Sequence, residues 1–187
     1  MNRHLKILLL GSYVWYFGEG LLGPLYAVFA QKIGGDILDL TAAYSMFLIV
    51  TGVLSIFVGK LADKRPKGSL MSHLMIAGYG LNALATFGYI FVDNPTKLFV
   101  VQFVLGISTA LATPTWEALF TLNTDKKKLG EQWGFSDGGP KIITGISIIL
   151  GGLLITFSSF TVLFLLMGII QLIATVIQYL IYLKPRS

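Results

Sequence analysis

The sequence contains no cysteine, only two histidines and few charged side chains. The lack of cysteine excludes disulfide bonds and thiolate metal sites. His4 and His73 are far apart along the chain, so a histidine-based metal centre or catalytic cluster is not expected. We therefore expect no cofactor and no metal. With no clustered nucleophiles or paired acids in its apolar segments, the chain is not expected to be an enzyme.

Charged residues make up 12% of the chain, against about 25% in soluble domains. Hydrophobic residues make up 55%, and the mean hydropathy is +0.76. Most of the chain is therefore expected to contact lipid or other apolar helices rather than water. The net charge of +5 would also suit nucleic-acid binding, but the basic residues stand in short clusters between apolar blocks. That pattern is typical of membrane topology, so we expect no nucleic-acid partner.

A membrane-spanning helix needs about 17–25 mainly apolar residues, and six segments of the chain meet this length. The first follows Arg3 and Lys6 and is too long for the apolar core of a signal peptide. The sequence thus predicts an all-α membrane protein with a single domain over 1–187. Its six transmembrane helices are expected at about 7–31, 41–58, 70–92, 98–121, 140–157 and 160–183.

The connections between these segments carry turn residues. Tight turns are expected at 34–36 and 93–95, where glycine, aspartate, asparagine and proline gather. The polar stretch 124–139 is expected to be the longest connection. Asp137 followed by Pro140 predicts the start of the fifth helix, with a capping acid and then proline in the first turn.

The positions of the basic residues orient these helices. Of the 14 basic residues, all but Lys32 and Lys97 fall on the side of the N-terminus, whereas Asp36, Asp39 and Asp93 fall on the other side. Because cytoplasmic loops of membrane proteins carry the excess of lysine and arginine, both termini are expected to be cytoplasmic. We expect a multi-pass protein of the plasma (inner) membrane.

An internal repeat relates two segments 90 residues apart: 24–30 begins with Pro24 and 114–120 begins with Pro114. The two segments run in opposite directions across the membrane. Inverted three-helix repeats recur in secondary transporters, and here they are expected at about 1–95 and 96–187. The same offset makes Thr109 the repeat partner of Glu19.

The charged run Gly59-Lys60-Leu61-Ala62-Asp63-Lys64-Arg65-Pro66-Lys67-Gly68 resembles the loop signature between the second and third helices of major facilitator superfamily transporters. Pro66 departs from it, since the family expects glycine there. The run 102–110 is similar to the family's fourth-helix pattern, with Gln102 in place of an arginine often tied to proton coupling. The resemblance implies one half of a major facilitator fold. It also implies a conformational latch formed by Gly59, Asp63, Lys64, Arg65 and Lys67, in which Asp63 docks on the start of helix 5 in the opposite half.

Family members normally have twelve helices in two halves. A single half would leave polar side chains of helices 1, 2, 4 and 5 against lipid, which is unfavourable. A parallel homodimer is therefore expected, because its two-fold axis can replace the pseudo-two-fold of a full-length transporter. A second half encoded separately and a piece of a longer chain are the alternatives. A small-molecule substrate and the lipid bilayer are the other expected partners.

Glu19 is the first candidate for a functional residue, since it lies about 18 Å into a hydrocarbon core about 30 Å thick. An acid at that depth is expected to face an aqueous cavity or to bind a proton, and either suits proton coupling. Asn82, Gln171 and Gln178 are expected to make structural hydrogen bonds. The predicted proton and substrate site consists of Glu19, Tyr16, Trp15, Tyr26, Gln102 and Thr109.

The expected function is secondary active transport of a small solute by alternating access, coupled to protons through Glu19, in a homodimer. The alternative is a transport-inactive membrane scaffold or assembly protein that keeps the fold. The substrate cannot be read from these residues, because aromatic, hydroxyl and amide groups suit several classes of solute.

Overall fold

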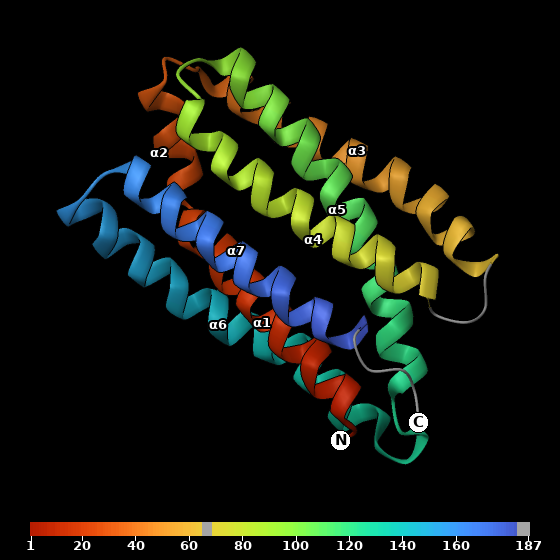
Figure 1. The fold of residues 1–187 in the computed structure, drawn as a ribbon. Coiled ribbons are helices and arrows are strands. Elements are labelled where there is room, and N and C mark those ends of the chain that lie inside the picture. The colour runs from red at the N-terminus through yellow and green to blue at the C-terminus, as the bar shows by residue number, and fades with distance from the viewer. Residues whose placement is uncertain (65–68, 183–187) are drawn as a thin grey trace.

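The computed structural model describes residues 1–64 and 69–182, and within those ranges the chain is helical with no strand (Figure 1). Seven α-helices and two short 3₁₀ helices follow one another. Their bounds are α1 (Arg3–Leu22), α2 (Leu25–Lys32), α3 (Ile37–Asp63), α4 (Ser69–Gly88), η1 (Tyr89–Phe91), α5 (Pro95–Asn123), η2 (Lys126–Lys128), α6 (Leu129–Phe157) and α7 (Phe160–Tyr182).

The sequence predicted one continuous helix over 7–31, but the first apolar segment is interrupted. It divides into α1 and α2 at Gly23 and Pro24, where Gly23 has a positive φ of 21°. Glycine tolerates this conformation, and proline cannot donate the backbone hydrogen bond that would continue the helix. Five helices of the described chain, α3 to α7, are long and apolar enough to span a membrane. The count of six spans therefore remains a prediction that depends on α1.

The fifth predicted helix was expected to begin at Pro140. It begins eleven residues earlier, at Leu129. Asp137 and Pro140 are therefore inside α6 and do not start it, so that prediction is wrong. Contacts from other elements hold the added turns: the buried Gln132 side chain accepts a hydrogen bond from the Asp125 N–H at 3.0 Å. Tyr13 donates to the Phe135 carbonyl at 2.8 Å. Long-range contacts thus override the glycine-rich composition.

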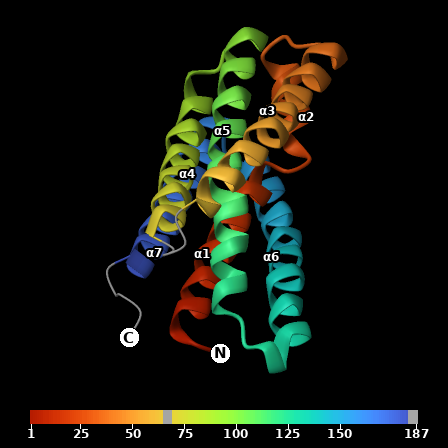
Figure 2. The ribbon, with the colours of Figure 1, turned by 90° about the vertical axis from the view of Figure 1, so that its right-hand side faces the viewer.

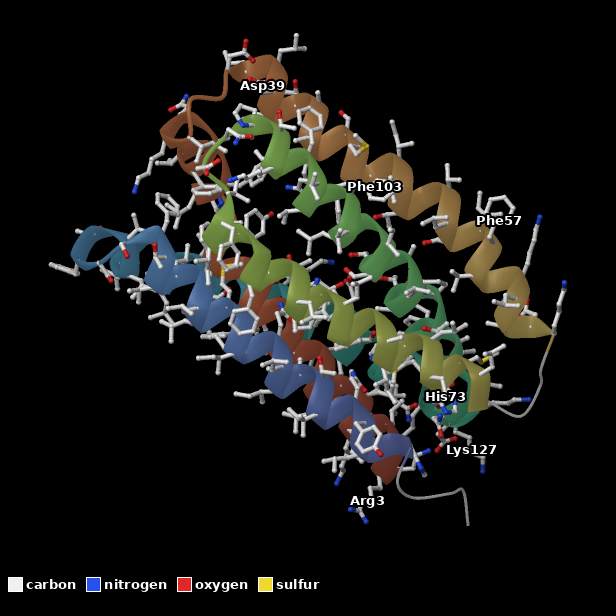
Figure 3. All side chains as sticks on the ribbon, turned by 45° about the horizontal axis from the view of Figure 1, so that its top comes forward. Arg3, Asp39, Phe57, His73, Phe103 and Lys127 are labelled. Carbon is white, nitrogen blue, oxygen red and sulfur yellow. The ribbon has the colours of Figure 1, made fainter. Side chains whose placement is uncertain are left out.

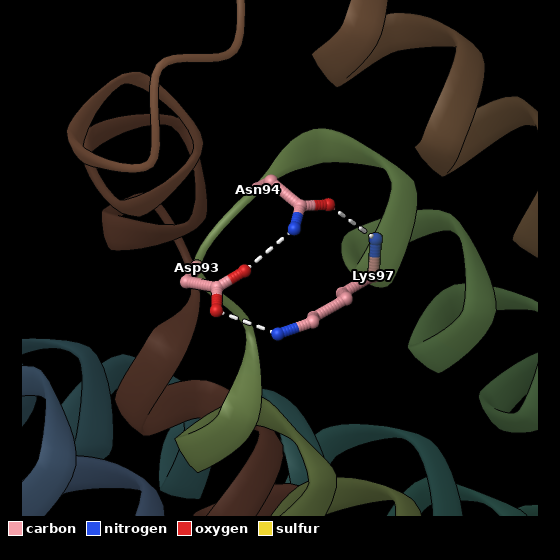
Figure 4. Close-up of polar contacts among 3 residues, drawn as sticks. All are labelled: Asp93, Asn94 and Lys97. Carbon is pink, nitrogen blue, oxygen red and sulfur yellow. Dashed lines mark hydrogen bonds and ion pairs between the residues drawn. The ribbon is translucent and has the colours of Figure 1, made fainter.

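The two predicted tight turns are confirmed, and each ends in a capped helix. Asp36 and Asp39 form a reciprocal capping box at the start of α3. Asn94 accepts a hydrogen bond from the Lys97 N–H at 3.0 Å and caps α5, while the Lys97 ammonium pairs with Asp93 at 2.6 Å (Figure 4). The hydrogen bond from Lys97 lowers the pKa of the exposed Asp93 carboxyl. These caps fix the direction in which α3 and α5 leave their turns.

The long helices lie across the bundle in the order α6, α1, α7, α4, α5, α3 (Figure 1). α1 packs on α6 and α7, and α5 packs on α3 and α4 in the same way. α4 and α7 contact each other between the two groups. These contacts keep their pattern when α1, α3 and α4 are exchanged for α5, α6 and α7, which is the pairing that the predicted inverted repeat would produce. Figures 1 and 2 both show α4 and α5 running side by side along the bundle.

The flanking helices α3 and α6 expose much apolar surface. Only Ala43 and Ala62 of α3 are buried, and side chains such as Phe57 project outward from it (Figure 3). α6 likewise exposes Ile142 and Ile149. The two flanks are thus apolar surfaces that need lipid or protein to cover them.

The ends of the bundle differ in charge: Arg3 and Lys127 lie at one end and Asp39 lies at the other (Figure 3).

Candidate functional site

Two pockets lie along the groove between α1, α4 and α5. The first, the Glu19 pocket, has a volume of about 590 Å³ and receives residues from α1 to α5. Glu19, Tyr26, Gln102 and Thr109 of the predicted site line it. Glu19 and its repeat partner Thr109 thus face the same space from α1 and α5.

Glu19 accepts hydrogen bonds from two neighbouring helices. Asn82 of α4 donates its amide hydrogen to Glu19 Oε1 at 3.0 Å, and Gln171 of α7 donates to the same oxygen at 3.4 Å. Gln171 also donates to the Trp15 carbonyl at 3.1 Å, and Thr86 donates to the Asn82 carbonyl oxygen at 3.4 Å. Both contacts to the carboxyl fall on Oε1. Among the described residues the second carboxyl oxygen accepts no hydrogen bond, so it is available for a proton or a ligand.

The opposite wall of the Glu19 pocket is built from tyrosines and an amide. The buried Gln102 donates to the Tyr89 hydroxyl at 3.3 Å. The hydroxyl of Tyr26 is buried close to the Gln102 amide, but among the described residues it makes no hydrogen bond of good geometry. Its ring centroid is 6.4 Å from that of Tyr44. A buried hydroxyl without a partner is costly, so Tyr26 has a hydrogen bond to offer to a ligand or to water in this pocket.

Trp15 and Tyr16, also predicted for the site, do not line the Glu19 pocket. They line a second pocket of about 410 Å³, here named the tryptophan pocket. Trp15 comes one helical turn before Glu19 on α1, and its ring packs edge-on against Tyr79 at 4.4 Å. The predicted group of six residues is therefore divided between two neighbouring pockets of one groove.

The tryptophan pocket contains residues that the sequence analysis did not select. Trp116 and Glu117 of α5 and Trp133 and Asp137 of α6 line it. Trp116 lies seven residues after Thr109, two turns farther along α5, and that spacing was a usable signal. Trp133 had no such signal, because its segment was expected to be a connection.

The structure places the predicted latch residues at the end of α3. Gly59 and Asp63 lie in its last turns and Lys64 follows as the C-cap. Asp63 and Lys64 are exposed in the single chain. Arg65 and Lys67 lie outside the described residues.

The docking target expected for Asp63, the segment 137–141, is not a helix N-terminus. It is the interior of α6, where Asp137 pairs with Lys141 at 2.5 Å. That part of the latch prediction is wrong, because the helix begins two turns earlier.

The described residues 1–64 and 69–182 offer no obvious metal site. No three histidine, cysteine, aspartate or glutamate side chains gather there closely enough to hold a metal ion. The chemistry that both pockets offer is therefore hydrogen bonding, aromatic contact and carboxylate charge. This is the chemistry of a binding site for a small solute.

Comparison with known proteins gives a match of residues 8–187 to the family model of the Major Facilitator Superfamily. The uncharacterized MFS-type transporter MJ1560 of Methanocaldococcus jannaschii is 23% identical over 180 residues, which are 96% of this chain and 46% of that protein. The multidrug resistance protein MdtG of Yersinia enterocolitica is 22% identical over 164 residues, 86% of this chain and 39% of that protein. The proton-coupled antiporter flippase LtaA of Staphylococcus saprophyticus is 24% identical over 139 residues, 73% of this chain and 34% of that protein. The chain spans less than half the length of these curated relatives.

Proposed function

Because the chain belongs to the Major Facilitator Superfamily, we propose that it is a multi-pass membrane protein that transports a small solute by proton-coupled alternating access. The observation that carries this proposal is the position of Glu19, an acid in the Glu19 pocket that amides from two other helices contact. The name of one relative supports the coupling ion, since LtaA of Staphylococcus saprophyticus is named a proton-coupled antiporter.

Glu19 suits the coupling role for an electrostatic reason. An acid inside a membrane is strongly disfavoured when it is charged and exposed to lipid, so such residues face a cavity or a polar partner. Here Asn82 and Gln171 supply partners to one carboxyl oxygen. The other oxygen can gain and lose a proton, or exchange it for a substrate group, as the pocket opens to one side and then the other.

We propose further that two copies of the chain form the transporter. The groove with both pockets has α3 on one flank and α6 on the other, and both expose apolar side chains. A two-fold axis along the membrane normal places α3 of one copy against α6 of its partner at both flanks. This arrangement covers both surfaces and replaces the half that the longer relatives contain. A separately encoded second half would have to supply the same two contacts.

Charge supports an orientation with the N-terminal end of the bundle in the cytoplasm and the α2 end outside. Lys60, Lys64 and the lysines of η2 lie at the end of the bundle where α3 finishes and α6 begins. The α2 end carries Asp36, Asp39 and Asp93. Under the positive-inside rule this distribution favours insertion in the plasma membrane with both termini inside.

The proposed latch now has a different acceptor. Asp63 ends α3 at the same end of the bundle where α6 begins at Leu129, and the N-cap residue Lys128 makes no side-chain capping hydrogen bond. In the two-fold dimer Asp63 of one copy can approach this N-terminus in the other copy. A carboxylate is stabilised there by the helix dipole.

A second candidate function is a transport-inactive membrane scaffold that retains the fold. It is favoured by Gln102, an uncharged residue where the family pattern has an arginine, and by its hydrogen bond to Tyr89. Neither function involves a chemical reaction.

Purified protein in liposomes tests the transport proposal. A pH dye trapped inside follows the decay of an imposed proton gradient while amino acids, sugars, nucleosides and organic cations are added in turn. We expect one class to accelerate the decay with the natural sequence, and the Glu19→Gln variant to lose that acceleration. Glu131→Gln is the matched control, because Glu131 lies in the first turn of α6 and lines neither pocket.

Two outcomes would contradict the proposal. Solute uptake that is unchanged by Glu19→Gln and by collapse of the gradient would exclude proton coupling through Glu19. If no class of solute moves while the protein remains folded, the scaffold function is the better account.

A further inference from the structure

All three tryptophans of the sequence line the tryptophan pocket. Trp15 comes from α1, Trp116 from α5 and Trp133 from α6, so elements far apart in the chain bring them together. Tyr16 and Tyr79 line the same pocket. Trp15 and Trp116 are also buried in the hydrophobic core, whereas Trp133 is 41% exposed, so the cavity lies between core residues and the start of α6.

The rings are held in place by contacts outside the cavity. Trp116 stacks on Phe120 with the centroids 5.0 Å apart, and Phe120 packs edge-on against Trp133 at 5.0 Å. The indole N–H of Trp116 donates to the Leu8 carbonyl at 3.1 Å. The polar edge of this indole is therefore already used. What Trp116 can offer a ligand is its ring.

The charge of the pocket is negative. Glu117 and Asp137 line it, and no lysine or arginine does. Asp137 pairs with Lys141 at 2.5 Å, so part of its charge is neutralised. Glu117 makes no ion pair among the residues that the structure describes. One carboxylate therefore stands beside the aromatic rings without a cation of the protein to balance it.

We propose that the tryptophan pocket binds an organic cation with apolar substituents on its charged nitrogen, such as a quaternary ammonium group. The faces of tryptophan and tyrosine attract such cations electrostatically, and tryptophan does so best. Glu117 supplies the opposite charge. The volume of about 410 Å³ is in the range of small-molecule sites, which extends from about 300 to 1,000 Å³.

This inference does not depend on the proposed transport function. It concerns equilibrium binding at Glu117 and the tryptophans, whereas coupling is assigned to Glu19 in the other pocket. Loss of proton-driven flux in Glu19→Gln with cation binding intact would separate the two, as would the converse result.

Binding is tested with purified protein in a maltoside detergent. Because every tryptophan lines the pocket, a bound cation is expected to change the intrinsic tryptophan emission. The probe is benzyltrimethylammonium, and the neutral control is neopentylbenzene, which has the same shape and no charge. We expect a saturable change in emission with the cation and none of similar affinity with the neutral molecule.

Substitutions at Glu117 and Trp133 locate the site. Glu117→Gln should weaken binding of benzyltrimethylammonium about fivefold, while Glu117→Asp should retain most of it and Glu131→Gln all of it. Trp133→Leu should weaken binding as well, and calorimetry measures it without relying on fluorescence. Trp133 is 41% exposed and leucine keeps an apolar side chain against Phe120, so this replacement is expected to leave the bundle folded. Equal affinity for the neutral isostere, or binding unchanged in both Glu117→Gln and Trp133→Leu, would overturn the proposal.

A quaternary ammonium group can belong to a free solute or to a phosphatidylcholine headgroup. The same titration in nanodiscs distinguishes them. Weaker apparent affinity for the probe in phosphatidylcholine than in phosphatidylethanolamine discs, whose headgroup has the same net charge but no quaternary nitrogen, identifies the headgroup as a competitor for the pocket. Equal saturable binding in both identifies a free cation as the ligand. Absence of binding in detergent and in both discs contradicts the inference.

Discussion

Two glycines of α1 pack against two glutamines of α7, and this contact positions Glu19. Gly11 and Gly18 are seven residues apart, as are Gln171 and Gln178. A Cβ built on Gly18 would lie 2.7 Å from Gln171 Nε2, and one on Gly11 would collide with the Gln178 side chain. The absent side chains let both amides reach backbone carbonyls of α1. In this way Gln171 comes within hydrogen-bonding distance of Glu19.

A pair of glycines on α4 allows a test of this close packing. A Cβ on Gly78 would lie 2.6 Å from both the Ser108 carbonyl oxygen and the Ala112 nitrogen, which are backbone atoms of α5. At Gly80 the nearest atom, in Thr175, is 3.8 Å away. We expect Gly78→Ala to destabilise the bundle by about 1–3 kcal/mol through overpacking. Gly80→Ala should be neutral or slightly stabilising, because alanine favours the helix. Thermal unfolding in detergent measures both, and equal melting temperatures would argue against a tight α4–α5 contact.

The sequence predicted part of the candidate site and missed part. Counting residues along the first helix identified Glu19, and the repeat identified Thr109, since both depend on position along one helix. Interhelical hydrogen bonds were predicted for Asn82, Gln171 and Gln178, and they are present. Trp15 and Glu19 line different pockets, and Trp133 lines the same pocket as Trp15. Both facts depend on how neighbouring helices are rotated about their axes. No single-chain pattern gives that rotation.

Among the helices, α6 departs most from expectation. Its first turns carry four glycines between 130 and 139, which favour a connection when the sequence is considered locally. The packing of Trp133 on Phe120 and the buried Gln132 stabilise the helix instead. By contrast, the starts of α3 and α5 were predictable, because Asp36 and Asn94 cap them through contacts within four residues. Local caps can be read from a sequence, whereas distant packing cannot.

The end of α3 supplies a prediction about the latch. If Asp63 docks on the start of α6 in the partner and stabilises the outward-facing state, Asp63→Asn should shift the balance towards the inward-facing state about twofold to fivefold. A cysteine introduced as Thr41→Cys reports this, since the chain has no other cysteine and Thr41 lines the Glu19 pocket. Its labelling by a water-soluble maleimide should slow in Asp63→Asn.

Asp63→Glu is the control, because it keeps the charge and should keep the labelling rate near that of the parent. If Asp63→Asn labels at the parent rate and transports normally, Asp63 has no latch function, and the run 59–68 is only a signal for topology.

The whole molecule has a contact pattern that is symmetric between its two groups of three helices. α1 and α5 occupy equivalent central positions, and α3 and α6 occupy equivalent flanks. The segments at Pro24 and Pro114 suggested this repeat. The two prolines differ in effect, however, because Pro24 lies at the break between α1 and α2 and Pro114 lies inside the continuous helix α5. The sequence does not identify what forms the second half of the proposed transporter. Apolar flanks look alike in a sequence whether lipid or protein covers them.

Disulfide cross-linking in native membranes tests the central claim, a two-fold transporter built from two copies, most directly. Ile49 of α3 and Ile142 of α6 are 64% and 68% exposed, and both lie near the middle of their helices. The chain without natural cysteines permits a clean Ile49→Cys, Ile142→Cys double variant. Leu84→Cys with Val176→Cys is the control, because both are exposed on α4 and α7, away from the proposed interface. We predict that mild oxidation gives a covalent dimer of the first variant and leaves the control monomeric. A first variant that remains monomeric, or that cross-links no better than the control, would contradict the two-fold assembly.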